Sequence, residues 1–542
     1  MAKPLGEWEI LKDQYNNPID SLVTAVHAVL IPLTGSPTEH PKGKVLYWHG
    51  RYITNYDNGG KIVTCLFDPE TSEIVQYTVP VWPGITEPFD PSKIFCSGHI
   101  TLEDGRVLTS GGERNIPPVA SRGLKYSFLF DQSQISLQSP PWRNTFNQSP
   151  PFSPTQMDRG RWYPQLTRLH NGRIVSMSGY RYESQEVELR PELFDPVTET
   201  WQLFNETADM AVPLYNGAHL IPFGSWKGEI FYDLVSFGPV LPNWNRPFRF
   251  KPDLLIPEWN SVGAERDMRL KGNSVILPIR PSDTTIRIIN LGGGENSSSR
   301  KSAEMIEIGT SSYPLWIQIP AMSYERHDAP NALLLPDGGL IVIGGGDESE
   351  TVLSPEILDY SDPDPLNWNW KSLPDMAVSR KYHSTALLLP DGSVWVGGSR
   401  IYDNPQRWEF ENDMERRIEI YKPGYFFDGI RPLITEAPLT IGYSTSNTFA
   451  LKYSLEEEPD VQIESVVLIS LPSVTHGFDC NQRFVYLDFS SPSKGTLQVI
   501  PPADEYISTP GYYMLFIVKP KTLSVSGATN LPSIAKIVKL QL

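Results

Sequence analysis

The chain has 542 residues and a formal net charge of -17, which disfavours nucleic acid and anionic membrane surfaces as partners because both are negatively charged. Its 40 glycines and 50 prolines are dispersed along the chain, a pattern typical of tight turns between short strands, so we expect an all-β protein. This length exceeds what one ordinary hydrophobic core requires, and we therefore expect two domains.

The amino-terminal segment, MAKPLGEWEILKDQ, has no apolar core of the signal-peptide type. The chain therefore either stays in the cytoplasm or begins after a removed leader. The longest apolar stretch, residues 23–33, contains a histidine and a proline and is much shorter than the roughly 20 residues of a membrane-spanning helix. We expect no membrane span.

The cysteines are Cys65, Cys96 and Cys480. They are too few and too scattered for a disulfide framework or a cysteine-based zinc site. A cysteine with a special role must therefore act alone.

One local pattern recurs from residue 25 to residue 421, namely an apolar run, a tight Asp-Gly or Asn-Gly turn, a second apolar run and then glycines. Clear copies are HITLEDGRVLTSGG ending at Gly112, LTRLHNGRIVSMSG ending at Gly179, ALLLPDGGLIVIGGG ending at Gly346 and ALLLPDGSVWVGGS ending at Ser399. Weaker copies lie near Val45, near Gly228 and before Gly294, which gives about seven copies.

A hairpin plus further strands in each repeat of about 50 to 65 residues describes one blade of a kelch-type β-propeller. We therefore expect a seven-bladed kelch-type β-propeller over residues 1–425, with its ring closed by pairing of residues 418–421 with amino-terminal strands.

After Pro423 the glycine doublets stop. The segments SVVLISL, RFVYLDF, TLQVI and YYMLFIV read as strands separated by proline and glycine turns. This pattern predicts an antiparallel, immunoglobulin-like β-sandwich over residues 426–542 as the second domain.

The repeats place three chemically distinctive residues at one equivalent position. Cys96, Tyr163 and His383 each lie eight residues before the Asp or Asn of their turn. Because equivalent positions of successive blades lie at one height around a propeller axis, we expect these side chains to approach one another, and Tyr382 can share their site. A further blade has Ala329 at this position, so the architecture alone does not require such residues.

Each of these residues also has a structural explanation. A lone cysteine is usually a small buried hydrophobe, and a strand tyrosine or histidine is usually packed or hydrogen-bonded. One imidazole beside two phenols and a thiol at one axial height instead suits Cu(II), which takes nitrogen and oxygen donors in tetragonal geometry. Both interpretations remain open on the residues alone.

The segment SRKYHSTALLLPDGSVWVGGS resembles the most diagnostic motif of the copper radical oxidases, the family of galactose oxidase and glyoxal oxidase. This resemblance implies that Tyr382 supplies an axial phenol and His383 an equatorial imidazole.

GRWYPQLTRLHNGRIVSMSG resembles the second motif of the family, which implies that Tyr163 is the equatorial ligand and the radical site. KIFCSGHITLEDGRVLTSGG resembles the motif whose cysteine, here Cys96, is joined to that tyrosine by a thioether. SVTHGFDCNQRFVYL followed by PGYYMLFIV resembles the family's sandwich domain, in which a loop brings the last ligand, here His476, to the propeller axis.

The resemblance implies one copper ion and a protein-derived Cys96–Tyr163 thioether radical cofactor. It also implies oxidation of a primary alcohol or a hydrated aldehyde, to an aldehyde or a carboxylic acid, with reduction of dioxygen to hydrogen peroxide. Tyr382 would accept the hydroxyl proton as general base, and the Tyr163 radical would remove a hydrogen atom from the adjacent carbon. The RWYP motif and the lack of an added carbohydrate-binding domain favour the glyoxal oxidase branch. We expect a monomer, and the family suggests an extracellular location.

The residue that covers the cross-linked ring is less well defined. The stretch SGYRYES follows the second motif, and the candidates are Tyr180, Arg181 and Tyr182. Arg326 and His327 lie eleven and ten residues before Asp337. Arg326 either contacts substrate hydroxyls or a carboxylate, or forms a salt bridge at the rim, which is the favoured interpretation.

Five further histidines are interpreted as structural; they are His27, His49, His99, His170 and His219. Cys480 is interpreted as a buried thiol near His476.

Two alternative functions remain. The first is a kelch interaction protein that keeps the fold without the chemistry. The second is a propeller hydrolase or lyase that uses acid and base groups, with Ca²⁺ or another metal, but the clearest repeats lack the axial carboxylates that it needs.

Overall fold

The structure is a computed structural model. It describes residues 5–49, 62–80, 94–114, 122–136, 139–145, 156–182, 184, 186–237, 244–252, 257–266, 268–294, 300–309, 313–347, 350–400, 414–455, 461–520 and 530–542. In these parts of the chain, strands dominate, and helical structure is limited to the single-turn α1 (Ser133–Ser136) and short 3-10 turns. The expected all-β class is confirmed.

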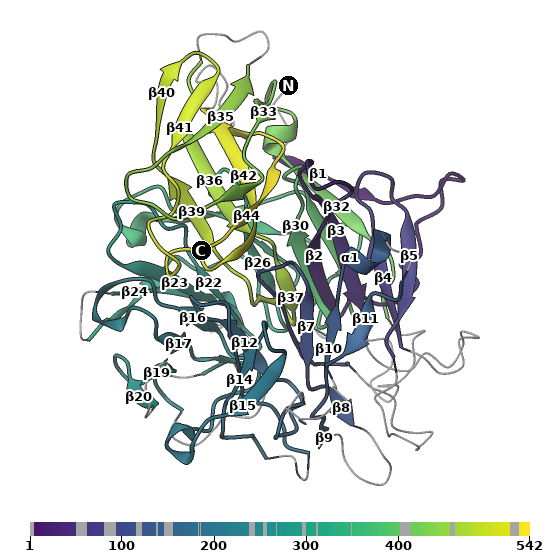
Figure 1. The fold of residues 1–542 in the computed structure, drawn as a ribbon, viewed down its shortest axis with the longest axis vertical. Coiled ribbons are helices and arrows are strands. Elements are labelled where there is room, and N and C mark those ends of the chain that lie inside the picture. The colour runs from purple at the N-terminus through teal and green to yellow at the C-terminus, as the bar shows by residue number, and fades with distance from the viewer. Residues whose placement is uncertain are drawn as a thin grey trace.

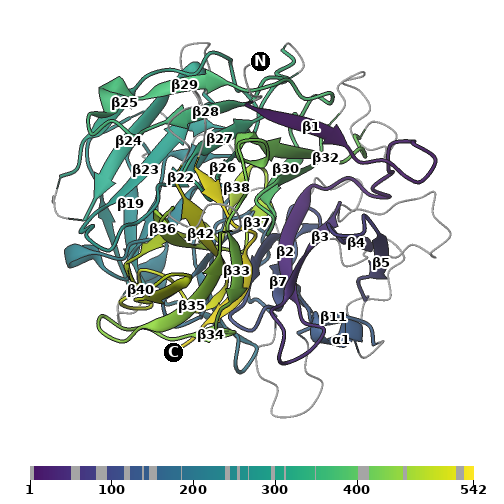
Figure 2. The same ribbon diagram turned by 90° about the horizontal axis from the view of Figure 1, so that it is seen from above.

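Most of residues 6–423 fold into antiparallel four-strand meanders that surround a common centre, with one strand of each innermost (Figure 2). The meanders nearest the amino terminus contain β2 (His27–Leu33), β3 (Lys42–Trp48), β4 (Val63–Phe67) and β5 (Ile74–Thr78); β6 (Gly98–Thr101), β7 (Val107–Ser110), β10 (Ser127–Phe130) and β11 (Trp142–Asn144); and β12 (Gln165–Arg168), β13 (Ile174–Met177), β14 (Glu192–Asp195) and β15 (Thr200–Leu203). The next meanders contain β16 (Ala218–Leu220), β17 (Ile230–Tyr232), β19 (Phe248–Lys251) and β20 (Glu258–Ser261); and β22 (Asn273–Ile276), β23 (Ile286–Leu291), β24 (Ala303–Ile308) and β25 (Trp316–Ile319). The last meanders contain β26 (Asn331–Leu334), β27 (Leu340–Ile343), β28 (Glu356–Asp359) and β29 (Asn369–Ser372); and β30 (Ser384–Leu388), β31 (Val394–Gly398), β32 (Glu419–Pro423) and β1 (Gly6–Ile10). Two short pairs add β8 (Glu113–Arg114) with β9 (Arg122–Gly123), and β18 (Val235–Ser236) with β21 (Arg269–Leu270). Each meander corresponds to one blade of the expected propeller.

The last blade takes its outermost strand from the beginning of the chain. β1 pairs antiparallel with β32, from Gly6 opposite Pro423 to Ile10 opposite Glu419. This pairing confirms the expected closure of the ring by an amino-terminal strand. Closure joins the two ends of the ring across a sheet, so the last blade does not end in an unpaired β32.

The carboxy-terminal strands form two further sheets that lie above the ring in Figure 1. One sheet contains β33 (Leu433–Glu436), β35 (Phe449–Ser454), β41 (Thr496–Val499) and β40 (Phe489–Ser493), and the other β34 (Thr440–Ile441), β44 (Lys536–Leu540), β42 (Gly511–Lys519), β43 (Leu531–Pro532), β36 (Ser465–Ser470) and β39 (Phe484–Leu487). Leu451 and Leu497 of the first sheet pack with Val466 and Leu515 of the second in one buried cluster. The predicted boundary after residue 425 falls between β32 and β33.

One hairpin leaves the sandwich and enters the ring. It consists of β37 (Ser473–Thr475) and β38 (Phe478–Asp479), and β37 pairs with the innermost strand β2. In Figure 2 both strands lie near the centre of the ring. The turn of the hairpin, His476–Gly477, is therefore delivered to the propeller axis.

A buried arginine–glutamate pair recurs in the blades and fixes the chain just before the innermost strands. The pairs are Arg161–Glu192 at 3.1 Å, Arg326–Glu356 at 2.8 Å and Arg380–Glu419 at 2.9 Å, and their side chains are 0% exposed. In each pair the glutamate begins the third strand of the same blade. Gly344 packs against the backbone oxygen of Arg380 in the next blade with φ of 68°, where a Cβ would clash. The glycines of the repeat thus allow neighbouring blades to approach closely at this end of the ring.

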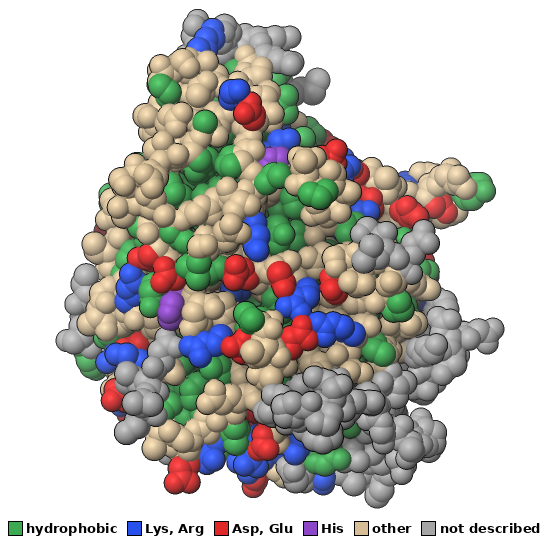
Figure 3. All heavy atoms as spheres, in the orientation of Figure 1, with side chains coloured by type: hydrophobic (Ala, Val, Ile, Leu, Met, Phe, Trp, Pro, Cys, Tyr) green, Lys and Arg blue, Asp and Glu red, His purple; other side chains and the backbone are tan. Residues whose placement is uncertain are grey.

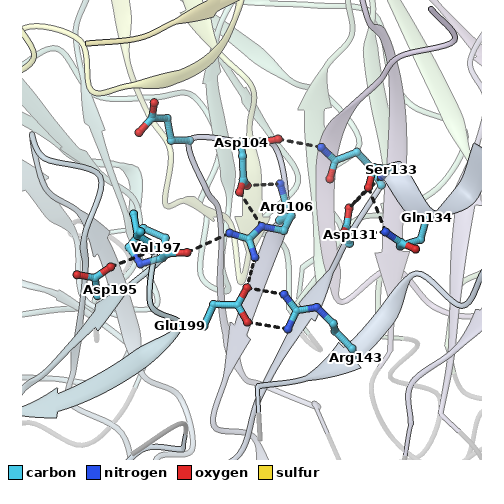
Figure 4. Close-up of polar contacts among 12 residues, drawn as sticks. Asp104, Arg106, Asp131, Ser133, Gln134, Arg143, Asp195, Val197 and Glu199 are labelled. Atoms are coloured by element: carbon cyan, nitrogen blue, oxygen red, sulfur yellow. Dashed lines mark hydrogen bonds and ion pairs between the residues drawn. The ribbon is translucent and has the colours of Figure 1, made fainter. Parts of the chain in front are cut away.

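Ion pairs also join blades farther from the axis. Glu199, in the turn between β14 and β15, accepts hydrogen bonds from Arg143 at 2.5 and 2.7 Å and pairs with Arg106 of the same neighbouring blade (Figure 4). Acidic and basic side chains are interspersed on the face of the molecule drawn in Figure 3. No helix in the described part of the chain is long and apolar enough to cross a membrane.

Candidate metal centre

The predicted site residues share an unusual backbone conformation. The φ angles are 51° at Cys96, 68° at Tyr163 and 67° at His383, values that side chains other than glycine rarely adopt. Ala329, at the same position of its blade, has φ of 55°. Ala329 has the same left-handed backbone conformation without a reactive side chain. The conformation is therefore a feature of the segment that leads into the innermost strand of a blade, and the chemistry depends on the side chain at that position.

The structure brings the five predicted ligand and cross-link residues together. The Tyr163 and Tyr382 hydroxyl oxygens lie 3.2 Å apart, and Cys96 Sγ lies 3.6 Å from His476 Nε2. One donor atom from each of Cys96, His383 and His476 lies within 4.8 Å of the others. All three of these side chains are buried. Residues that are distant in the sequence thus form one compact donor cluster.

Backbone hydrogen bonds between blades hold the entrance turns. Tyr163 N–H donates to Cys96 O at 3.0 Å, and Tyr215 N–H donates to Tyr163 O at 3.3 Å. The N–H of Cys96 donates to Nε2 of His27 at 3.0 Å. His27 was expected to be structural, and in the structure it positions Cys96.

Thr475 orients the ring of His476. The Thr475 hydroxyl lies 3.2 Å from the Val26 carbonyl oxygen and 2.7 Å from Nδ1 of His476. When that hydroxyl donates its one proton to Val26, Nδ1 carries the proton that joins it to Thr475. The lone pair of Nε2 then faces Cys96 and the centre of the cluster. Such an oriented imidazole is the arrangement found in metal-binding histidines.

Burial sets the protonation of the cluster. It raises the pKa of Tyr163 well above its ordinary value, and contacts with Cys96 and Tyr382 add to the shift. Burial also lowers the pKa of His476 well below its ordinary value, with His99 and Lys271 adding to it. The phenol is therefore neutral at pH 7 without a metal, and the imidazole is in the form that binds one.

The donor set fits a copper ion. Two imidazoles and two phenols supply the nitrogen and oxygen ligands that suit Cu(II). The two imidazoles are buried, and the two phenols are half-buried. Cys96 Sγ with the two imidazoles also matches the His₂Cys set of blue-copper sites. The two arrangements differ in the fate of the thiol, because a cysteine bonded to a tyrosine ring cannot act as a thiolate ligand.

Trp162, Tyr180 and Arg181 differ in how they lie relative to the Tyr163 ring. Trp162 lies against that ring with centroids 4.7 Å apart and 52° between the planes, and Tyr180 packs on Trp162 at 5.6 Å. Arg181 pairs with Glu186 and Glu188. Tyr180 is thus in contact with Trp162, and Arg181 is held by two carboxylates, while the residue that covers the ring stays a prediction.

Tyr182 lies beside Gly160, because a Cβ added to Gly160 would lie 2.5 Å from the Cβ of Tyr182. The neighbour of the ring that the sequence analysis missed is Trp162, which stands in the RWYP motif directly before Tyr163. Successive strand residues normally face opposite sides, but the positive φ of Tyr163 breaks this alternation and lets the two rings meet.

Arg326 does not form a salt bridge at the rim. Its side chain is 0% exposed, pairs with Glu356 at 2.8 Å and donates to the carbonyl oxygens of Gly344 and Ser354. An ion pair of Arg326 was expected, but it is buried within the blade instead of lying at the rim. The substrate contact considered for this residue has no support, because its guanidinium is used within its own blade.

The other expected structural histidines have protein contacts: His49 packs on Phe95, His99 Nδ1 lies 2.7 Å from Ser473 Oγ, His170 stacks on Tyr506, and His219 Nε2 lies 2.8 Å from Ser274 Oγ. Phe95 in turn packs on His383. Cys480 is partly buried and lies 3.7 Å from the side-chain nitrogen of Gln165.

Two further residues stand at blade entrances with positive φ, Tyr215 at 39° and Lys271 at 58°. The ring of Tyr215 lies 4.6 Å from that of His476, and its hydroxyl donates to Ser97 O at 2.8 Å. The ammonium of Lys271 lies 5.2 Å from the centroid of the Tyr382 ring. Their repeats lack a clear Asp-Gly or Asn-Gly turn, so the eight-residue offset could not locate them.

Comparison with known proteins adds independent information. Residues 91–425 match the family model described as Glyoxal oxidase N-terminus, and residues 431–540 match the galactose oxidase-like early set domain. The chain is 28% identical over 484 residues to an aldehyde oxidase GLOX of Vitis pseudoreticulata, covering 82% of each chain. It is 23% identical over 528 residues to a galactose oxidase of Gibberella zeae, covering 93% of this chain and 68% of that one.

A solved structure supports the fold. A fungal alcohol oxidase of the AA5 family, in complex with copper, superposes with a TM-score of 0.72 at 20% sequence identity, over 99% of this chain and 100% of that chain. This similarity covers both the ring and the sandwich.

Proposed function

The chain belongs to the glyoxal oxidase family and is an oxidase of alcohol or aldehyde groups; we propose that its chemistry uses a radical on Tyr163 cross-linked to Cys96. The observation that carries the proposal is a single cluster in which the buried Cys96, His383 and His476 meet the half-buried Tyr163 and Tyr382. Tyr163, Tyr382, His383 and His476 would hold the copper ion, and Cys96 would modify the radical tyrosine.

The cross-link forms by a two-electron oxidation. The S–H bond of Cys96 and one ring C–H bond beside the hydroxyl of Tyr163 break, and a C–S bond forms. The two electrons and two protons pass to dioxygen and give hydrogen peroxide. The sulfur delocalises the unpaired spin of the ring and so lowers the potential at which the radical forms.

The phenol oxygens of Tyr163 and Tyr382 can then remove two hydrogens from the substrate, one from its hydroxyl group and one from the carbon that bears this hydroxyl. Tyr382 Oη accepts the hydroxyl proton as general base, and the Tyr163 radical removes a hydrogen atom from the adjacent carbon. Since these oxygens are 3.2 Å apart, they can reach neighbouring atoms of one small molecule. Copper held by these residues would supply a one-electron couple for the second electron of the substrate. Dioxygen would accept that electron together with the hydrogen atom of Tyr163 and the proton of Tyr382, which gives hydrogen peroxide and restores the radical.

The substrate reaches the cluster past Lys271. Its side chain is 45% exposed, although its ammonium lies over the Tyr382 ring, so this residue joins the cluster to the solvent. The ligands His383 and His476 are buried, and Tyr163 and Tyr382 are half-buried, which suits a small aldehyde hydrate or a simple primary alcohol. Such compounds also fit the glyoxal oxidase side of the family.

The cross-link is tested by intact mass. Copper and dioxygen should lower the mass of the purified chain by two hydrogens, and Cys96→Ser should abolish this loss. Cys65→Ser is the matched control, because Cys65 is equally buried but lies on β4, and it should retain the loss. An unchanged mass together with an intense visible absorption that Cys96→Ser removes would instead indicate a blue-copper site.

The activity is tested by peroxide release. Glyoxal, methylglyoxal, glycolaldehyde, benzyl alcohol and galactose should be compared, and the small aldehydes should give the highest kcat/KM. Absence of both copper uptake and peroxide with every compound would favour the interaction scaffold.

A further inference from the structure

A second group of ionisable side chains lies beside the blade entrance at Ala329. Glu325 and His327 precede β26, and Asp347 and Glu350 follow β27 of the same blade. One donor atom from each of Glu325, His327 and Glu350 lies within 4.8 Å of the others. The blade thus carries a mixed nitrogen and oxygen donor set that the proposed oxidase chemistry does not use.

The imidazole of His327 is the unusual member of this group. Its side chain is 8% exposed, and neither ring nitrogen makes a hydrogen bond of good geometry, although carboxylate oxygens lie within ion-pair distance of both. Burying a polar ring in this way is costly unless another partner is present. A cation shared with those carboxylates would satisfy the ring.

Carboxylate oxygens nevertheless surround the ring. Nε2 lies 3.3 Å from Glu325 Oε2 and 3.6 Å from Glu350 Oε2, whereas Nδ1 lies 2.8 Å from Asp347 Oδ2. One N–H at Nε2 would have to be shared between these two carboxylates. Two oxygens and a nitrogen lone pair that converge on one point are instead the arrangement of ligands around a shared cation.

We propose that Nε2 of His327 and the carboxylates of Glu325 and Glu350 bind a divalent transition-metal ion of the zinc type. An imidazole with carboxylates suits such ions better than Ca²⁺ or Mg²⁺, which take oxygen ligands. Asp347 lies where a carboxylate commonly orients the other nitrogen of a metal-bound histidine. Arg300 lies 3.9 Å from Glu325 and offsets only part of the negative charge.

The bound ion would act as a clamp between two loops. It joins the segment before β26 to the segment after β27. Asp328, the neighbour of His327, pairs with Lys271 at 2.9 Å, and Lys271 lies over the Tyr382 ring. The clamp would therefore hold the wall of the copper cluster without contributing a ligand to it. The site is assigned from its own residues and does not depend on the oxidase proposal.

The site is tested by metal stoichiometry on the full chain. The protein is loaded with one equivalent of copper and dialysed against ZnCl₂, and copper and zinc are counted separately by elemental analysis. Wild type should bind one zinc in addition to copper. Glu350→Gln should weaken zinc binding at least about tenfold, since loss of even an outer-sphere partner costs roughly 10- to 100-fold, and His327→Asn should abolish it. Glu258→Gln, which removes an exposed carboxylate on β20, is the matched control and should bind like wild type.

The variants also separate binding from folding. Zinc should raise the melting temperature of wild type and Glu258→Gln but not of Glu350→Gln. If His327→Asn fails to fold, Glu350→Gln still carries the test, because that glutamate side chain is 40% exposed. Wild-type zinc binding that both cluster variants retain would overturn the site, as would absence of zinc binding to wild type. Binding of Ca²⁺ without zinc would overturn the assigned class of ion.

Discussion

Tyr382 is the residue whose replacement best separates metal binding from chemistry. Its ring stacks on that of His383 with centroids 3.9 Å apart and 29° between the planes, and phenylalanine can keep this contact. Tyr382→Phe removes the proposed base and should lower kcat by about 10²- to 10⁴-fold. The mass loss of the cross-link should stay close to wild type, and the remaining ligands Tyr163, His383 and His476 should still hold copper. An unchanged kcat, measured by peroxide release, would assign proton removal to another group.

Arg326 tests whether a buried arginine serves the framework or the substrate. Arg326→Met leaves Glu356 as a buried charge without its cation, which typically costs about 3–5 kcal/mol. The melting temperature should fall, whereas kcat/KM of the remaining folded enzyme should match wild type. Glu356→Gln should behave in the same way. A raised KM at unchanged stability would restore the substrate contact considered from the sequence.

Cys96, Tyr163 and His383 could be predicted because a tight turn marks the register of their repeats, so an eight-residue offset is meaningful. Lys271 and Tyr215 share the backbone conformation, but the sequence does not mark their turns. Where the repeat signal is weak, the position of a residue depends on long-range packing, which single-sequence patterns do not contain.

At the scale of elements, the hairpin β37–β38 holds His476 through its own tight turn. Gly477 has φ of 81°, and an added Cβ would lie 2.6 Å from the backbone oxygen of Pro330 beside β26. Gly477→Ala should therefore displace the hairpin, lower copper affinity and lower kcat. Gly442→Ala is the matched control, because nothing lies within 4 Å of its added Cβ, and it should retain full copper content. Equal copper binding by both variants would show that the turn tolerates the methyl group.

A buried polar chain joins the innermost strands β16 and β22. Nε2 of His219 lies 2.8 Å from Ser274 Oγ, which donates to Asp233 at 2.9 Å. Burial lowers the pKa of His219 to about 3, with Arg483 adding to the shift. The neutral ring therefore contributes stability above the unfolded pKa near 6.5, and this contribution is lost as the pH falls from there toward 3. Melting temperatures between pH 7 and pH 4 should fall less for His219→Gln than for wild type.

Asp233 acts in the opposite direction. Burial raises the pKa of its carboxyl from 3.8 to about 6, although hydrogen bonds from Asn290, Leu234 and Ser274 oppose the shift. Its contribution to stability therefore decreases as the pH rises through this interval. Asp233→Asn should steepen the acid loss that His219→Gln reduces. Parallel slopes in both variants would contradict this assignment of the two groups.

The hairpins within blades could be predicted, because each depends on a turn signal next to its own strands. The pairing of β37 with β2 could not. Thr475 Oγ1 donates to Val26 O across 449 residues of sequence, and no local pattern encodes that contact. The family resemblance, rather than strand propensity, pointed to His476.

At the scale of the whole molecule, the sandwich is fastened to the ring close to the cluster. Arg483 donates to Leu220 O of β16 at 3.1 Å, and Ile279 forms a bridge with Val485 of β39. These contacts flank the hairpin that carries His476. The second domain is therefore part of the site, although its predicted boundary lies far from that residue in sequence.

Ring closure links the stability of the whole molecule to the metal. Trp8 of β1 donates its indole N–H to Pro374 O at 2.9 Å, and its ring lies 4.9 Å from that of Tyr421 on β32. Trp8→Ala should cost about 2 kcal/mol, less than the roughly 3–5 kcal/mol of a fully buried tryptophan, and should lower the melting temperature by a few degrees. Because His383 precedes β30 of the same closing blade, the temperature at which copper is released should fall in parallel. Tyr15→Ala, which removes a 75% exposed ring, should change neither temperature. A lower melting temperature at an unchanged copper-release temperature would show that the closing blade can loosen without disturbing the ligands at its inner end.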